Sequence, residues 1–85
     1  MNERISYYAI VDDHSSRDEP AGVLRRVEDD EGERDEAFGR DLRWGRTSLL
    51  YSAERGNADH KFFPIGEDEA MRIVERIRGE AHADG

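Results

Sequence analysis

Hydrophobic and polar positions in the first third of the chain follow the pattern of two β-strands. Ile5–Val11 is a nearly continuous apolar and aromatic run, which is typical of a strand buried on both faces in the middle of a sheet. Gly22–Glu28 alternates instead, so that its two valines fall on one face and Leu24 on the other. The polar residues 12–21 separate the two segments as a loop.

Two further segments predict strands. Residues 28–32 (EDDEG) are turn-forming and end in glycine, which favours a hairpin connection to a third short strand at Glu33–Phe38. Residues 33–38 also have the composition of a helix start, so both structures stay open there. Residues 60–65 (HKFFPI) indicate a fourth strand. Pro64 places it near an edge of the sheet or at its own end, because proline cannot donate to the ladder.

The second half of the chain also predicts a short helix. Thr47 fits the N-cap position, residues 48–55 (SLLYSAER) fit a short helix, and Gly56 fits the residue that ends it.

A longer helix is predicted near the C-terminus. Gly66 occupies the N-cap position and three acidic residues follow it, where they suit the positive end of the helix dipole. We expect Gly79 to close this helix and residues 80–85 to form a frayed tail. The apolar face has helical spacing and consists of Ala70, Ile73, Val74 and Ile77.

The predicted element order is β-β-β-α-β-α. The simplest architecture for this order is an α+β fold, in which a small antiparallel sheet of three to four strands is covered on one face by the C-terminal amphipathic helix and the short middle helix. A chain of 85 residues is long enough for one domain, which we place at residues 1–79.

Composition changes this picture mainly through charge. The net charge is −8, and the absence of cysteine excludes disulfides, thiolate metal sites and a cysteine nucleophile. Residues 12–41 hold twelve acidic residues against five arginines, whereas residues 42–63 hold two against four basic residues. Such acidity favours basic partners and disfavours general binding to DNA or RNA. The apolar run near the N-terminus is too short to span a membrane, so we expect a cytoplasmic protein.

The densest acidic segment, EDDEGERDE at residues 28–36, has two interpretations. Charge runs of this kind are commonly the solvated turn of a hairpin. The alternative is a recognition surface for a basic protein partner, as in inhibitors that imitate nucleic acid or in immunity proteins. The candidate partner-binding residues are its seven acids: Glu28, Asp29, Asp30, Glu31, Glu33, Asp35 and Glu36.

The segment RDLRWGR suggests a nucleic-acid contact, because arginines contact phosphates and aromatic rings stack on bases. The candidates for this contact are Arg40, Arg43, Trp44, Arg46 and Arg55. The letters W-G-R resemble the WGR domain of DNA-repair proteins. The glycine-rich continuation of that domain is replaced here by TSLLYSAERG, which marks the match as coincidental. We therefore expect Trp44 to be mostly buried and the flanking arginines to pair with upstream acids.

One group of side chains has the chemistry of a metal site. Its members are Asp12, Asp13, His14, Asp59 and His60. Adjacent strand residues point to opposite faces, so the two neighbouring aspartates rarely chelate one ion. A serine beside His14 supplies two residue types of a hydrolase triad. Residues adjacent in the sequence seldom have the geometry of such a triad, however. We therefore expect no enzyme, no metal and no cofactor.

Aromatic residues occur in adjacent pairs on two predicted strands, at Tyr7 and Tyr8 and at Phe62 and Phe63, so they point to both faces of the sheet. One face meets the helices. The other needs a second layer or forms an exposed apolar patch, which in a small protein often indicates a dimer interface. A homodimer is therefore a further expectation.

Several segments resemble, in their order, a group of short actinobacterial proteins of unknown function. These segments are YYAIVDD, PAGVLRR and RDEAFGRDLRW, a threonine-capped Leu-Leu-Tyr segment, and the helix EDEAMRIVERI. The resemblance covers residues 7–78 and implies no activity, cofactor or site residue. From the residues alone we expect a small acidic, non-enzymatic protein-binding module. Nucleic-acid contact is the alternative, and a small metal-dependent enzyme is the third hypothesis.

Overall fold

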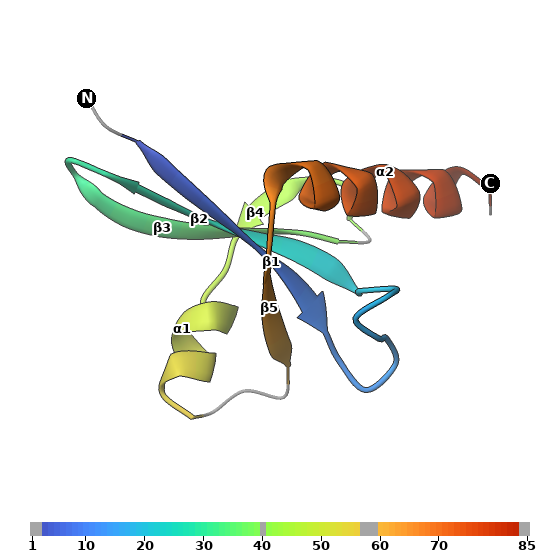
Figure 1. Ribbon diagram of the computed structural model, residues 1–85, viewed down its shortest axis with the longest axis horizontal. Helices are drawn as coiled ribbons and strands as arrows, with labels where there is room; N and C mark the ends of the chain where they lie inside the picture. The colour runs from blue at the N-terminus through green and yellow to red at the C-terminus, as the bar shows by residue number, and fades with distance from the viewer. Residues whose placement is uncertain (1–2, 40, 57–59, 84–85) are drawn as a thin grey trace.

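The computed structural model of the chain describes residues 3–39, 41–56 and 60–83. The predicted α+β class is confirmed, because these residues form one antiparallel sheet with helices packed on it (Figure 1). The elements are β1 (Arg4–Val11), β2 (Gly22–Asp29), β3 (Gly32–Phe38), β4 (Trp44–Arg46), α1 (Leu49–Glu54), β5 (Lys61–Ile65) and α2 (Glu67–Ala83).

The strands lie in the order β4-β3-β2-β1-β5, and all neighbours are antiparallel. β1 lies between β2 and β5, so the prediction of an interior first strand is confirmed. β5 forms an edge of the sheet, as its proline indicated, and Pro64 lies opposite Tyr8 in the register. Residues 33–38, for which strand and helix both stayed open, belong to β3.

The predicted count of three to four strands is wrong, because the sheet has five. The missed strand is β4, which is only three residues long and therefore too short to show an alternating pattern. It forms because the edge of β3 supplies partners for it, with Trp44 opposite Phe38 and Arg46 opposite Glu36.

The predicted end of the long helix at Gly79 is also wrong, because α2 continues to Ala83. Positive φ angles occur at Gly32 and Gly56 but not at Gly79, so the last of these glycines does not act as a left-handed C-cap. Residues 84 and 85 of the predicted tail lie outside the described residues.

α2 covers one face of the sheet with the apolar side that its spacing predicted. Ala70, Ile73, Val74 and Ile77 are buried against strand residues of β1, β2 and β3 in one apolar cluster. Phe38, only 1% exposed, is the largest of those strand residues. We call this side of the sheet the α2 face.

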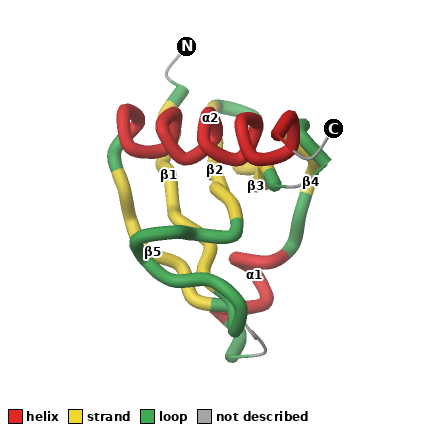
Figure 2. The backbone as a smooth tube through the Cα atoms, turned by 90° about the vertical axis from the view of Figure 1, so that its right-hand side faces the viewer, coloured by secondary structure: helices red, strands yellow, loops and turns green. Residues whose placement is uncertain are grey.

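The prediction that the middle helix shares this face is wrong. α1 lies on the opposite side, which Figures 1 and 2 show and which we call the α1 face. There Leu50 packs with Ile10 and Leu24 in a second, smaller cluster. The β-strands alternate their side chains, so residues adjacent in β1 and β2 contribute to opposite clusters.

Candidate functional site

The β2–β3 hairpin carries the predicted partner-binding acids. Its turn is Asp30–Glu31, and the N–H of Glu31 donates to the carboxylate of Asp29 at 2.8 Å. Gly32 has a φ of 131°, a conformation that side chains rarely adopt. Figure 1 shows the hairpin end extending beyond the start of α2. The acids of the turn therefore lie beyond the part of the sheet that α2 covers.

Two of the seven acids form short ion pairs within the hairpin with little exposure to solvent. Arg26 donates to both carboxylate oxygens of Asp35, at 2.8 Å and 3.0 Å. Arg25 donates from Nε to Oε1 of Glu36 at 2.7 Å. The side chains of the two acids are only 9% and 20% exposed. These two carboxylates therefore offer little free charge to a partner.

Arg26 also connects the hairpin to α1. Its Nη2 donates to Oε1 of Glu54 at 2.9 Å, and its Nη1 lies 3.9 Å from the carboxylate of Glu33. The hydrogen bonds that Arg26 donates to Asp35, and then to Glu54, raise the pKa of Arg26 above its ordinary value. This arginine is therefore a fixed cation that ties α1 to the sheet on the face opposite α2.

The remaining acids lie nearer to solvent. Exposed at the hairpin end are Asp30, Glu31 and Glu33, and half-buried there are Glu28 and Asp29. Among these five, Asp29 lies 3.4 Å from Arg34, and Glu33 has the longer contact with Arg26. The hairpin end thus presents more carboxylates than the described arginines beside it neutralise.

Trp44 lies on the α2 face of β4 and packs against the cluster there with only a minor part of its surface exposed, so the expectation of a mostly buried tryptophan is confirmed. Its ring centroid is 5.6 Å from that of Phe38. The guanidinium of Arg25 lies over the tryptophan ring, 4.1 Å from the centroid, which is a cation–π geometry. Because the same arginine is hydrogen-bonded to Glu36, it is held in place over the ring that a base would need.

The structure does not gather the arginines of the nucleic-acid hypothesis on one surface. Arg43 is 82% exposed, and its 3.8 Å contact with Asp41 is too long for a hydrogen bond. Arg46 is exposed on the α2 face, whereas the exposed Arg55 follows α1, which lies against the other face. Arg40 lies outside the described residues.

Three of the residues considered as metal ligands, Asp12, Asp13 and His14, lie together in the turn after β1. Asp12 accepts hydrogen bonds from the N–H of His14 and from the hydroxyl of Ser15, each at 2.9 Å. These two bonds, the backbone one first, lower the pKa of Asp12 below its ordinary value, and the charges of His14 and His60 add to the effect. In residues 3–39, 41–56 and 60–83, no three His, Asp or Glu side chains are grouped to hold a metal ion. Asp59 lies outside these ranges.

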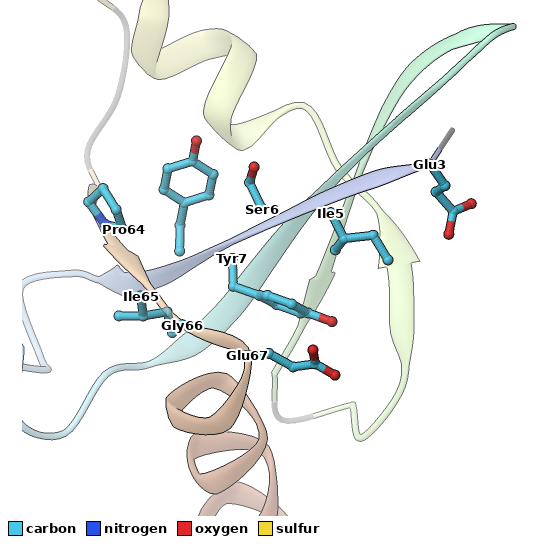
Figure 3. Close-up of a pocket in the computed structure, with 9 residues that line it drawn as sticks. Glu3, Ile5, Ser6, Tyr7, Pro64, Ile65, Gly66 and Glu67 are labelled. Atoms are coloured by element: carbon cyan, nitrogen blue, oxygen red, sulfur yellow. The ribbon is translucent and has the colours of Figure 1, made fainter. Parts of the chain in front are cut away.

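An open groove lies where β1 continues past the end of β5. Its volume is about 620 Å³, and its walls come from the start of β1, the end of β5 and the first turn of α2. Figure 3 shows the side chains of Ile5, Tyr7 and Glu67 on one side of β1 and that of Ser6 on the other. Ile5 is 41% exposed although it lies in a strand.

Sequence reasoning missed this groove, because a groove at the end of one strand depends on where the neighbouring strand stops. The available signal was local: Pro64 and Gly66 mark the end of β5, while the apolar run of β1 extends further. Which strand lies beside β1 is a matter of topology, and the sequence pattern does not specify it.

Within the described part of the chain, no helix combines the length and the apolar character needed to cross a membrane. Comparisons with protein families, with curated proteins and with solved structures give no match for this chain. The resemblance to short actinobacterial proteins therefore stays a prediction, and the function has to be inferred from the geometry.

Proposed function

We propose that this protein is a small, acidic, non-enzymatic module that binds a basic protein partner through the end of its β2–β3 hairpin. The carrying observation is the contrast within that hairpin. Asp35 and Glu36 are paired with arginines, whereas Asp30, Glu31 and Glu33 are exposed at its end. Exposed carboxylates concentrated on one projecting element attract cationic side chains and speed encounter with them.

The test is a binding titration with an acetylated, amidated peptide of eight lysines at low and at moderate salt. The variant D30N/E31Q/E33Q should bind roughly tenfold more weakly than the unmodified protein, because exposed ion pairs contribute about 0.2–1 kcal/mol each. The matched control D13N/D18N/E19Q removes the same charge from the exposed loop after β1. Equal losses in both variants would show general charge attraction and contradict a hairpin site.

The homodimer receives less support from the structure. Tyr7 and Phe63 pack against the cluster under α2, and Tyr8 and Phe62 pack against the cluster beside α1. The aromatic pairs that suggested an exposed apolar face are thus used within one copy of the chain. Light scattering at several protein concentrations decides between monomer and dimer.

Nucleic-acid contact is the weaker alternative, because Arg25 covers the ring of Trp44 and the arginines lie on different faces. A titration with single-stranded DNA, double-stranded DNA and RNA at low salt tests it, since low salt maximises attraction to phosphates. Quenching of the fluorescence of Trp44, the chain's one tryptophan, would support stacking on a base.

A further inference from the structure

β1 is longer than the strand beside it. Its register with β2 begins at Arg4, opposite Glu28, whereas its register with β5 begins only at Tyr7, opposite Ile65. The segment Arg4–Ser6 is therefore paired as a strand on its β2 side alone. Such an edge is a template for a further strand, because its free N–H and C=O groups can pair with another chain.

Pro64 identifies which backbone groups face the open side. Proline has no N–H, so Tyr8 and Pro64 form a position of the ladder without a mutual pair of hydrogen bonds. Hydrogen-bonded positions alternate with such positions, which places one at Tyr7 and Ile65. The next hydrogen-bonding position along β1 is Ile5. In the same register it would face Glu67, which already belongs to α2. The N–H and C=O of Ile5 therefore point into the groove.

The groove is acidic. Glu3 and Glu67 contribute carboxylates and Tyr7 a hydroxyl group, and the described residues that line it include no lysine or arginine. In Figure 3 the side chains of Tyr7 and Glu67 extend in the same direction, on the side of β1 that also carries Ile5. A strand added here would meet an exposed apolar side chain with carboxylates on the same wall.

We infer that this groove takes an extended, basic segment of a partner protein, which adds to the edge of β1 and forms hydrogen bonds with the backbone of Ile5. The inference rests on the proposed protein-binding function and gives it a second contact and a binding mode. Backbone bonds supply affinity in strand addition, and alternate side chains supply specificity. Here a lysine or arginine meets Glu3 and Glu67, and a branched apolar residue packs on Ile5.

A second copy of this chain is a poorer occupant. Pairing two β1 edges about a twofold axis brings the same surface of each copy together. The carboxylates of Glu3 and Glu67 in one copy would then approach those in the other. Like charges opposite each other destabilise a strand pair, so the charge of the groove favours a basic partner over self-association.

The test is an NMR titration of the isotope-labelled protein at low salt with the acetylated, amidated hexapeptide Thr-Lys-Thr-Val-Thr-Lys, in which lysine, valine and lysine share one face of the strand. The largest amide shift is expected at Ile5, with slower hydrogen exchange of its N–H. The variant E3Q/E67Q should bind about three- to tenfold more weakly, from the loss of two exposed charge pairs. The matched variant D13N/D18N, which removes the same charge from the exposed loop after β1, should bind within about twofold of the unmodified protein.

Three outcomes would overturn the inference. Shifts confined to residues 29–33 and reduced by E31Q/E33Q would place the peptide at the hairpin, which leaves the proposed function intact. Equal binding of the same hexapeptide with glutamate in place of both lysines would remove the charge argument. The absence of any shift at residues 3–7 would exclude strand addition, whatever the eight-lysine peptide does at the hairpin.

Discussion

The two faces of the sheet are closed in different ways. On the α2 face, a helix of 17 residues buries four apolar side chains against Ala9, Val23 and Phe38. On the α1 face, a helix of six residues buries Leu50 in a smaller cluster, and Arg26 bonds to it through Glu54. One face is held by apolar area, and the other by a small apolar cluster together with an ion-pair network.

The difference follows from helix length. A long amphipathic helix presents several turns of one apolar stripe to the sheet, so burial alone fixes it. A helix of six residues offers fewer than two turns and is marginal without tertiary support. Arg26, with a side chain only 13% exposed, supplies part of that support by joining Asp35 of β3 to Glu54 of α1.

The largest loss of stability is expected from a cavity on the α2 face. Ile77→Ala should lower the free energy of unfolding by about 2–4 kcal/mol, because a buried isoleucine loses its contacts and leaves a void. Urea titrations followed by the fluorescence of Trp44 measure this free energy of unfolding, because the tryptophan packs against the same cluster. The exposed Met71 on the same helix offers the control, and Met71→Ala should change stability by less than about 1 kcal/mol.

On the α1 face, Arg26→Met should cost about 2 kcal/mol, because it leaves the nearly buried carboxylate of Asp35 without its cation. The double variant Arg26→Met/Asp35→Leu should recover at least half of this loss, since no unpaired charge remains. Glu54→Gln, at a side chain that is 55% exposed, should cost no more than about 0.5 kcal/mol. Equal losses for Arg26→Met and the double variant, by urea titration, would contradict a charge-pair role.

The close approach of β2 and β3 affects both faces, since both clusters draw residues from these strands. A Cβ at Gly22 would lie 2.5 Å from the carbonyl oxygen of Phe38. Gly22→Ala should therefore cost about 1–3 kcal/mol through a forced backbone shift. Gly45→Ala is the control, because a Cβ there meets nothing within 4 Å. If both substitutions shift the urea midpoint alike, crowding at Gly22 is not the cause.

The smallest effect is expected in the loop after β1, which belongs to neither cluster. The pKa of Asp12 is lowered in the folded protein, so its ionised form stabilises the fold above the ordinary aspartate pKa. This contribution is lost as the pH falls through the lowered folded pKa. The melting temperature of the unmodified protein should therefore exceed that of Asp12→Asn at neutral pH, and the difference should vanish in acid.

A substitution of one hydrogen-bond donor sharpens that test. Ser15→Ala removes the hydroxyl that donates to the Asp12 carboxylate but keeps the backbone bond from His14, which is the first cause of the lowered pKa. The pKa of Asp12, followed by NMR of its side chain, should rise toward the ordinary value without reaching it. An unchanged pKa would show that the hydroxyl does not stabilise the carboxylate.

Some elements could be predicted from particular residues, because their signals are local. The period of Ala70, Ile73, Val74 and Ile77 indicated the buried face of α2, and the apolar run Ile5–Val11 indicated an interior strand. The candidate sites were less predictable. The acids of residues 28–36 look alike in sequence, but the structure pairs two of them closely with arginines and leaves three exposed.

By itself, the sequence determined the α+β class, the hairpin, the apolar side of α2 and the acidity of residues 28–36. Only the tertiary structure decided that α1 lies opposite α2 and that β4 forms at the edge of β3. It also decided that Arg25 covers the ring of Trp44, and that β1 extends past the end of β5 and leaves an acidic groove there. Periodicity and capping act between residues a few positions apart. The face that a helix covers, the strand that forms an edge and the residues that pair depend instead on contacts between strands that are distant in the sequence. The packing of the whole chain sets these contacts.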